Sequence, residues 1–270
     1  MTGVAAAFAR AAEEGRAVLV GDLPAGFPTV DGAIAAARAM AESGVDVIEI
    51  GLPYTDPLID GPVIQTAVHR ALAGGTRVTD VLCTVEALAA GGVPVLVMTY
   101  WNPVDHYGVR RFARDLAAAG GCGLITPDLP PEEAGPWLHA AAEHDLDRVF
   151  LVAPSSTQER IELITKACTG FVYAVSVMGI TGARDRVGEA AASVVSRVRA
   201  ATELPVGVGL GVRDGAQAAE VAGFADGVIV GSAFVQRLLD APELAAAIQG
   251  VRDLAGDLAA GVRRPARAAR

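Results

Sequence analysis

Eight short runs of β-branched and other apolar residues recur along this 270-residue chain, and Ala-rich stretches separate them. The runs predict strands at Val18–Leu23, Val45–Ile50, Val95–Thr99, Gly123–Thr126, Arg148–Val152, Phe171–Val175, Pro205–Gly209 and Gly227–Val230. Between them, apolar residues recur three and four positions apart, a spacing typical of amphipathic helices. These stretches predict helices at Asp31–Ser43, Val78–Ala89, Arg110–Ala119, Glu132–Glu143, Gln158–Ala167, Glu189–Ala201 and Gly215–Ala222. Strands that alternate with helices pair in parallel, because each helix returns the chain to the same end of the sheet.

The predicted strands are mostly apolar, as expected when both faces of a sheet are buried. Eight strand–helix units in a chain of this length predict an α/β protein with a single (β/α)8 TIM barrel. We expect the barrel to span residues 1–262, with an extra N-terminal helix and a short helix after the eighth strand, and residues 263–270 to form a basic, disordered tail. The alternative, a doubly wound open sheet, requires G-x-G-x-x-G after the first strand, but residues 21–26 read Gly-Asp-Leu-Pro-Ala-Gly.

Charge and composition exclude several classes of partner. The 22 basic and 31 acidic residues give a net charge of −9, which argues against a nucleic-acid binder. No run of about 18 uncharged apolar residues is present, so we expect no membrane span. Glu13 and Glu14 stand where a signal peptide would have an apolar core, and Cys83, Cys122 and Cys168 are too scattered for a disulfide framework. We therefore expect a cytoplasmic protein.

The side chains available for covalent or metal chemistry are few. Lys166 is the only lysine and therefore the only candidate for a Schiff base, but it lies in a predicted helix. The four histidines form no H-x-H or H-E-x-x-H pair. We expect no metal site and no cofactor bound by this chain.

Two carboxylates stand near the exit of the second predicted strand. Glu49 lies between Ile48 and Ile50, and Asp60 follows in a loop that three prolines stiffen. A carboxyl group in such a strand either faces the pocket with a raised pKa, able to transfer protons, or is structural and paired with an arginine. Asp60 is either a second functional carboxylate or a turn cap. The residues alone leave both alternatives open.

Glycines mark the exits of the last three strands, and aromatic residues stand near the ends of the third and sixth. Backbone N–H groups at such glycines can approach an anion, and the loops after strands seven and eight form the usual phosphate pocket of this fold. The alternative is that these are plain barrel turns. Tyr100 and Tyr173 add aromatic walls, which suits a phosphate ester with a flat organic end.

These segments resemble one family, the alpha subunit of tryptophan synthase. The resemblance rests on IEIGLPYTDPLIDGPVIQ at 48–65, on 173–182, on Gly209-Leu210-Gly211 and on Gly231-Ser232, and it extends from about Ala17 to Leu239. It implies a lyase of tryptophan biosynthesis that cleaves indole-3-glycerol phosphate to indole and glyceraldehyde 3-phosphate. It also implies an alpha2-beta2 heterotetramer with a beta subunit that carries pyridoxal phosphate.

The resemblance also implies roles for single residues. Glu49 matches the general acid/base, Asp60 the carboxylate that holds the indole N–H, and Tyr173 a tyrosine near the reacting centre. The matching phosphate-binding positions are Gly182, Gly211, Gly231 and Ser232, and the indole pocket includes Asp22, Tyr100 and Thr181. The positions that face the partner are Pro53, Asp56, Asn102 and Pro130.

One position departs from the family pattern. The family usually has an aromatic residue where this chain has Asp22, and a carboxylate against a flat apolar ring costs desolvation unless it is paired. Asp22 therefore keeps open a specialised or stand-alone paralogue that acts on a related indolic phosphate. A non-catalytic regulatory partner is the third hypothesis, and the presence of both Glu49 and Asp60 argues against it.

Overall fold

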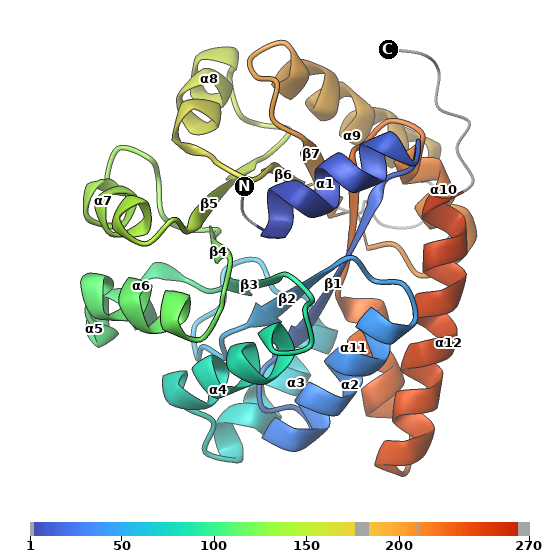
Figure 1. The fold of residues 1–270 in the computed structure, drawn as a ribbon. Coiled ribbons are helices and arrows are strands. Elements are labelled where there is room, and N and C mark those ends of the chain that lie inside the picture. The colour runs from blue at the N-terminus through green and yellow to red at the C-terminus, as the bar shows by residue number, and fades with distance from the viewer. Residues whose placement is uncertain (1–2, 176–183, 210, 264–270) are drawn as a thin grey trace.

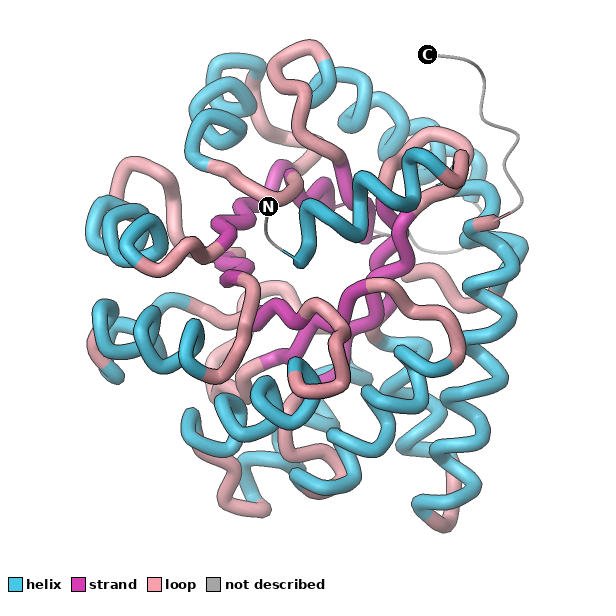
Figure 2. The backbone as a smooth tube through the Cα atoms, viewed as in Figure 1, coloured by secondary structure: helices cyan, strands magenta, loops and turns pink. Residues whose placement is uncertain are grey.

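The computed structural model describes residues 3–175, 184–209 and 211–263, with the side chains of 184–187 excepted. Eight parallel strands close into a barrel in chain order, and β8 pairs with β1 (Figures 1 and 2). The strands are β1 Val18–Pro24, β2 Val47–Gly51, β3 Val95–Met98, β4 Gly123–Thr126, β5 Asp147–Val152, β6 Val172–Val175, β7 Val206–Gly209 and β8 Gly227–Val230. The predicted (β/α)8 barrel is confirmed, and each strand lies within two residues of its predicted bounds.

Helices surround the barrel. They are α1 Gly3–Glu13, α2 Val30–Glu42, α3 Pro62–Ala73, α4 Val78–Ala89, α5 Trp101–Tyr107, α6 Val109–Ala118, α7 Gly135–Glu143, α8 Gln158–Ala167, α9 Arg184–Arg199, α10 Gly215–Ala222, α11 Ser232–Asp240 and α12 Leu244–Val262. The sequence analysis missed α3, α5 and α12. Glycines weaken the helical signal of α12, but Gly261 is needed there, because a Cβ at this position would lie 2.1 Å from the Gly215 carbonyl oxygen of α10.

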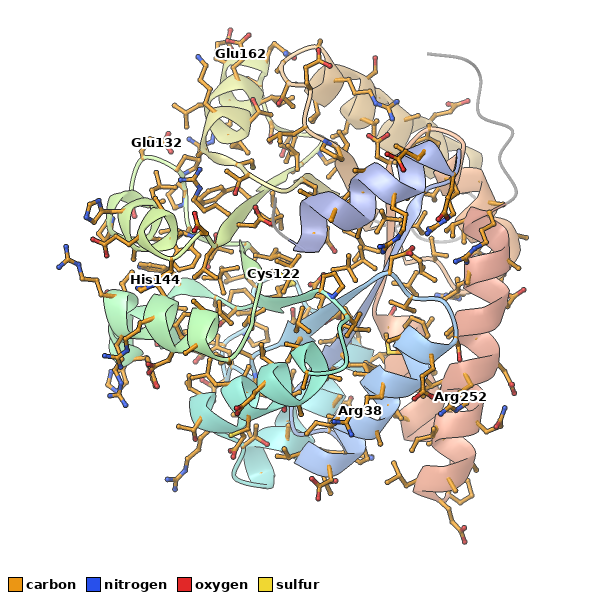
Figure 3. All side chains as sticks on the ribbon, in the orientation of Figure 1. Arg38, Cys122, Glu132, His144, Glu162 and Arg252 are labelled. Atoms are coloured by element: carbon orange, nitrogen blue, oxygen red, sulfur yellow. The ribbon has the colours of Figure 1, made fainter. Side chains whose placement is uncertain are left out.

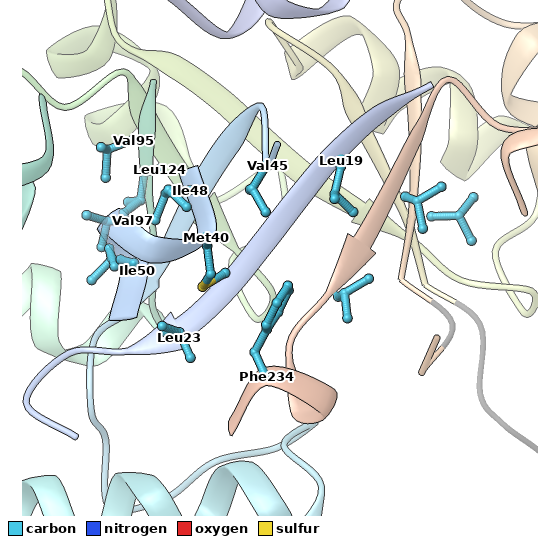
Figure 4. Close-up of a cluster of buried hydrophobic side chains, with 14 of the residues drawn as sticks. Leu19, Leu23, Met40, Val45, Ile48, Ile50, Val95, Val97, Leu124 and Phe234 are labelled. Atoms are coloured by element: carbon cyan, nitrogen blue, oxygen red, sulfur yellow. The ribbon is translucent and has the colours of Figure 1, made fainter. Parts of the chain in front are cut away.

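Successive strand residues point to opposite faces, and both faces are apolar. In β1, Val18 and Val20 pack inside the barrel, whereas Leu19 and Leu23 pack outward under the helices. Figure 4 shows this outer layer, with Met40 of α2 close to the strands. This alternation places Asp22 on the inner face of β1, since it lies two residues beyond Val20.

The N-terminal helix α1 crosses one opening of the barrel (Figure 2). Its Phe8 packs against Phe171, with 5.3 Å between the ring centroids, and Val4 joins the same interior cluster. Phe171 directly precedes β6, and a Cβ at Gly227, the first residue of β8, would lie 3.1 Å from Phe8 Cζ. The helix α1 therefore closes the amino-terminal end of the barrel. The carboxyl end is therefore the end available for chemistry, as in other barrels of this type.

Charged side chains occupy the outer layer. In Figure 3 Arg38, Glu162 and Arg252 lie on the outer helices and Glu132 lies in the turn before α7, while Cys122 lies toward the barrel. No described helix is both long and apolar enough to cross a membrane. At the end of α12 the Arg263 guanidinium donates to the Ala259 carbonyl at 2.9 Å, and residues 264–270 lie outside the described residues.

Candidate active site

Glu49 and Asp22 are paired neighbours on β2 and β1, and both lie on the inner face of the barrel. Glu49 is only 1% exposed, and its Oε2 has no hydrogen-bond partner among the described residues. No ion pair to Glu49 forms within that part of the chain. This favours the pocket-facing interpretation of Glu49 over a structural carboxylate paired with arginine. A buried carboxyl oxygen without a partner leaves hydrogen-bonding capacity for a ligand.

Asp60 is held by a tyrosine from the next strand exit. The hydroxyl of Tyr100 donates to Asp60 Oδ1 at 3.0 Å and accepts from the backbone N–H groups of Leu58 and Ile59 at 3.0 and 3.1 Å. The Tyr100 ring is buried and lies 5.5 Å from the ring of Tyr54, centroid to centroid. One phenol therefore orients the carboxylate and orders the loop that carries it. The sequence analysis placed Tyr100 in the pocket but missed this role.

The three carboxyl groups share one poorly solvated region. Burial and then the charge of Asp60 raise the pKa of Asp22 to about 7. The pKa of Glu49 lies well above its usual value because of burial and then the charges of Asp22 and Asp60. Burial also raises the pKa of Asp60, while the hydrogen bond from Tyr100 acts in the opposite direction. Such groups can hold and transfer a proton near neutral pH.

Tyr173 faces the same interior region from β6. It is buried, and the charges of Glu49 and Asp22 add to burial in raising its pKa. A Cβ at Gly209 would lie 2.6 Å from the Tyr173 hydroxyl, so the end of β7 must be glycine to leave room for the phenol. The sequence analysis treated this exit as part of a phosphate turn, and only the barrel geometry reveals the second reason for the glycine.

The predicted phosphate residues are partly within the described chain. Gly231 caps the N-terminus of α11, and Ser232 is its first residue, so the positive end of this helix opens at the β8 exit. Gly211 has φ +66°, a conformation that favours glycine. Gly182 and Thr181 lie outside the described residues.

A small cavity of about 40 Å³ lies between the exits of the first four strands. Its lining joins carboxyl, phenol and apolar groups, namely Asp22, Pro24, Gly51, Leu52, Asp60, Ile64, Val68, Met98, Thr99, Tyr100 and Pro127. Glu49 is not among the lining residues, but it lies directly beside Asp22 in the strand register. The described residues contain no cluster of His, Cys, Asp or Glu that could hold a metal ion.

Comparison with known proteins identifies the relationship. The family model of the tryptophan synthase alpha chain matches residues 8–262. The chain belongs to the tryptophan synthase alpha chain family. The alpha chain of Salinispora arenicola is 64% identical over 266 residues, covering 98% of this chain and 100% of the relative. That of Thermobifida fusca is 58% identical, covering 99% and 100%.

Solved structures agree with this assignment. A chain of Mycobacterium tuberculosis tryptophan synthase has a TM-score of 0.90 and 55% identity, covering 97% of this chain and 98% of the other. The alpha subunit from Legionella pneumophila has a TM-score of 0.89 at 31% identity, covering 97% and 98%. The resemblance seen in the sequence is thereby confirmed, and so is the fold.

The four positions predicted to face a partner in this family all follow β2, β3 or β4, so they lie at one end of the barrel. Pro53 is buried, Pro130 is half-buried, and Asp56 and Asn102 are exposed. The backbone N–H of Trp101 donates to Asp128 Oδ1 at 2.9 Å, which links the β4 exit to α5, the helix of Asn102.

Two apolar side chains on the same rim were not predicted. Leu58 and Ile59 are 74% and 51% exposed in the loop of Asp56 and Asp60. Large exposed apolar residues in a loop that is otherwise held in place indicate a contact surface. The sequence signal was present in the motif, but their exposure depends on how Tyr100 holds the neighbouring backbone.

Tyr100→Phe should loosen the loop that carries Asp60. The variant removes three hydrogen bonds, so we expect a loss of about 1–3 kcal/mol in the free energy of unfolding. The pKa of Asp60 should rise further, because the lost hydrogen bond lowers it in the native protein. Urea denaturation and a carboxyl ¹³C NMR titration measure the two effects. Tyr54→Phe is the control, since its hydroxyl has no hydrogen bond among the described residues, and equal effects of both variants would contradict the role of Tyr100.

Proposed function

We propose that this chain cleaves indole-3-glycerol phosphate to indole and glyceraldehyde 3-phosphate, with Glu49 as the acid and base and Asp60 as the partner of the indole N–H. Membership in the tryptophan synthase alpha chain family supports the reaction. The observation that carries the residue assignment is the buried, unpartnered oxygen of Glu49 beside the carboxyl groups of Asp22 and Asp60.

The proposed chemistry uses the substrate ring as its electron sink. Protonated Glu49 donates its proton to C3 of the indole, and the ring becomes an indoleninium cation. The Glu49 carboxylate then removes the proton of the adjacent side-chain hydroxyl. As that oxygen becomes the carbonyl of glyceraldehyde 3-phosphate, the C–C bond breaks and its electrons return to the ring, which leaves as indole. Glu49 ends protonated, ready for another cycle.

Asp60 has an electrostatic role in this scheme. Its carboxylate accepts a hydrogen bond from the indole N–H and stabilises the positive charge that develops on the ring, an effect that is larger in a site shielded from water. Tyr100 supports this role because it fixes the carboxylate at 3.0 Å. We place Tyr173 near the reacting centre, because its hydroxyl interacts electrostatically with Glu49 and Asp22.

The phosphate group is proposed to bind at the N-terminus of α11. Gly231, Ser232 and Gly211 supply backbone N–H groups there, and the helix dipole favours an anion. Gly182 is assigned to the same subsite, and Thr181 to the indole pocket, on the family resemblance alone.

The chain is proposed to work with a beta subunit in an alpha2-beta2 heterotetramer. Tryptophan synthase structures are among its structural neighbours. Pro53, Asp56, Asn102 and Pro130 are assigned to the contact surface, and the exposed side chains of Leu58 and Ile59 extend it. Pyridoxal phosphate would be bound by the partner, and the partner would consume the indole. We assign the complex to the cytoplasm.

An indole-release assay on the purified chain, with and without a tryptophan synthase beta subunit, tests this function. We expect slow indole release by the chain alone and acceleration when the beta subunit is added. Asp22 favours a second candidate, a stand-alone enzyme for a related indolic phosphate, and that candidate predicts a rate that the beta subunit leaves unchanged. No release of indole under either condition would contradict the proposed reaction.

A further inference from the structure

Asp22 stands between the carboxyl pair and the helix end that is proposed to bind phosphate. Its partner in the strand register is Glu49 on one side. On the other side, a Cβ at Gly231 would lie 2.5 Å from Asp22 Oδ2, so the carboxyl group lies directly against the cap of α11. A Cβ at Gly51 would lie 3.7 Å from Oδ1, which places the other oxygen toward the β2 exit. One side chain therefore adjoins both halves of the proposed substrate site.

Within the described residues, no positive charge compensates Asp22. The titratable groups that face it are Glu49 from β2, Asp60 from the following loop and Tyr173 from β6. The described residues of β8 carry no titratable side chain, and α3 contributes Ile64 and Val68 to the cavity beside Asp22. No described residue donates a hydrogen bond to the Asp22 carboxyl group. With no compensating group among the described residues, the Asp22 carboxylate is neutralised by protonation.

We propose that Asp22 is a specificity-determining residue that couples binding of the phosphate ester to a proton, so that the site accepts the ester when the Asp22 carboxyl group is neutral and disfavours it when the group is ionised. This proposal rests on the proposed function, because it requires the phosphate to bind at the N-terminus of α11. It also explains how a carboxyl group can replace an aromatic side chain at this position, since its neutral form lacks the repulsive charge.

The direction of the effect follows from like-charge repulsion. An ionised Asp22 against Gly231 repels a phosphate held by the N–H groups of Gly231 and Ser232, and the low solvation of the site weakens screening. Bound phosphate therefore raises the pKa of Asp22 above the value of about 7 that it has in the free protein. By linkage, affinity is full below this pKa and declines as the pH rises through it. A rise of about one pKa unit on binding corresponds to a limit of about tenfold in Kd.

The test is calorimetric titration of the full chain with glycerol 3-phosphate at pH 6 and pH 8, for the native protein and for Asp22→Asn. The ester itself loses its second proton near pH 6, and Asp22→Asn shares that contribution while lacking the titrating carboxyl group. We expect the ratio of the native Kd to the Asp22→Asn Kd to rise about fivefold between the two pH values. A ratio that stays constant would overturn the proposal.

A second measurement does not depend on the variant. Titrations of the native protein at pH 7.5 in two buffers of different ionisation enthalpy report the protons taken up on binding. We expect net uptake of a fraction of a proton, and zero uptake or release would overturn the proposal.

Indole release in the same preparations tests the proposed function separately. If indole is released but the Kd ratio is constant between the two pH values, the proposed function is supported and the role of Asp22 is contradicted. If no indole is released, the proposed function is contradicted, and the Kd ratio alone decides the role of Asp22.

Discussion

Glu49→Gln is expected to lower kcat for indole release by about 10²–10⁴, because the amide can neither donate the proton to C3 nor accept the hydroxyl proton. Binding of glycerol 3-phosphate should survive, since the phosphate subsite lies at the α11 end of the site. Steady-state kinetics and calorimetric titration measure the two effects. The amide is uncharged, like the protonated form that burial favours, so the variant should remain folded.

Glu86→Gln is the matched control for this change. Glu86 is exposed on α4, far from any role in the proposed reaction, and its change to glutamine is chemically the same. The Glu86→Gln variant should therefore keep the native rate. Turnover by Glu49→Gln at the native rate would remove the acid and base assignment. A parallel loss of phosphate binding would mean that Glu49 organises the site rather than acting in the reaction.

Asp60→Asn is expected to reduce kcat by about 10²–10³, since a neutral amide cannot stabilise the charge that develops on the indole ring. The asparagine oxygen can still accept the hydrogen bond from Tyr100, so the loop should keep its conformation. The same indole-release assay, without a beta subunit, measures the effect.

Asp56→Asn removes a carboxylate from the same loop and serves as the control. Asp56 is exposed, so its variant should retain the rate of the chain alone. If both variants lose activity equally, the overall charge of the loop and not the contact of Asp60 with the ring is responsible.

The barrel could be predicted because its signal is local and repeated. Each β-branched run, such as Val47–Gly51, is buried on both faces, and each helix between strands has its own apolar stripe. The sequence analysis missed α3 and α5 because each shares a connection with a second helix, and α3 begins at Pro62 directly after a proline-rich loop. The spacing of the predicted strands shows that such a connection is long, but it does not show how many helices the connection contains.

The candidate site could be predicted in part. The strand order implied that Glu49 and Asp60 would meet the glycine-bearing exits, because parallel strands end on the same rim. The hydrogen bond from Tyr100 to Asp60 spans 40 positions, and its existence depends on the path of the 52–61 loop. No local pattern encodes that path.

The alternation of apolar strands and helices by itself determined a closed parallel barrel with its chemistry at the carboxyl ends of the strands, and the long motif around Glu49 determined the family. Only the tertiary structure decided that Asp22 lies against Gly231 and that the hydroxyl of Tyr173 lies over Gly209. The first contact joins β1 to the residue after β8, which closure of the barrel brings together, and the second joins the neighbouring strands β6 and β7. The order of residues in one strand specifies which face a side chain takes, but its distance from the neighbouring strand depends on how all eight strands pack.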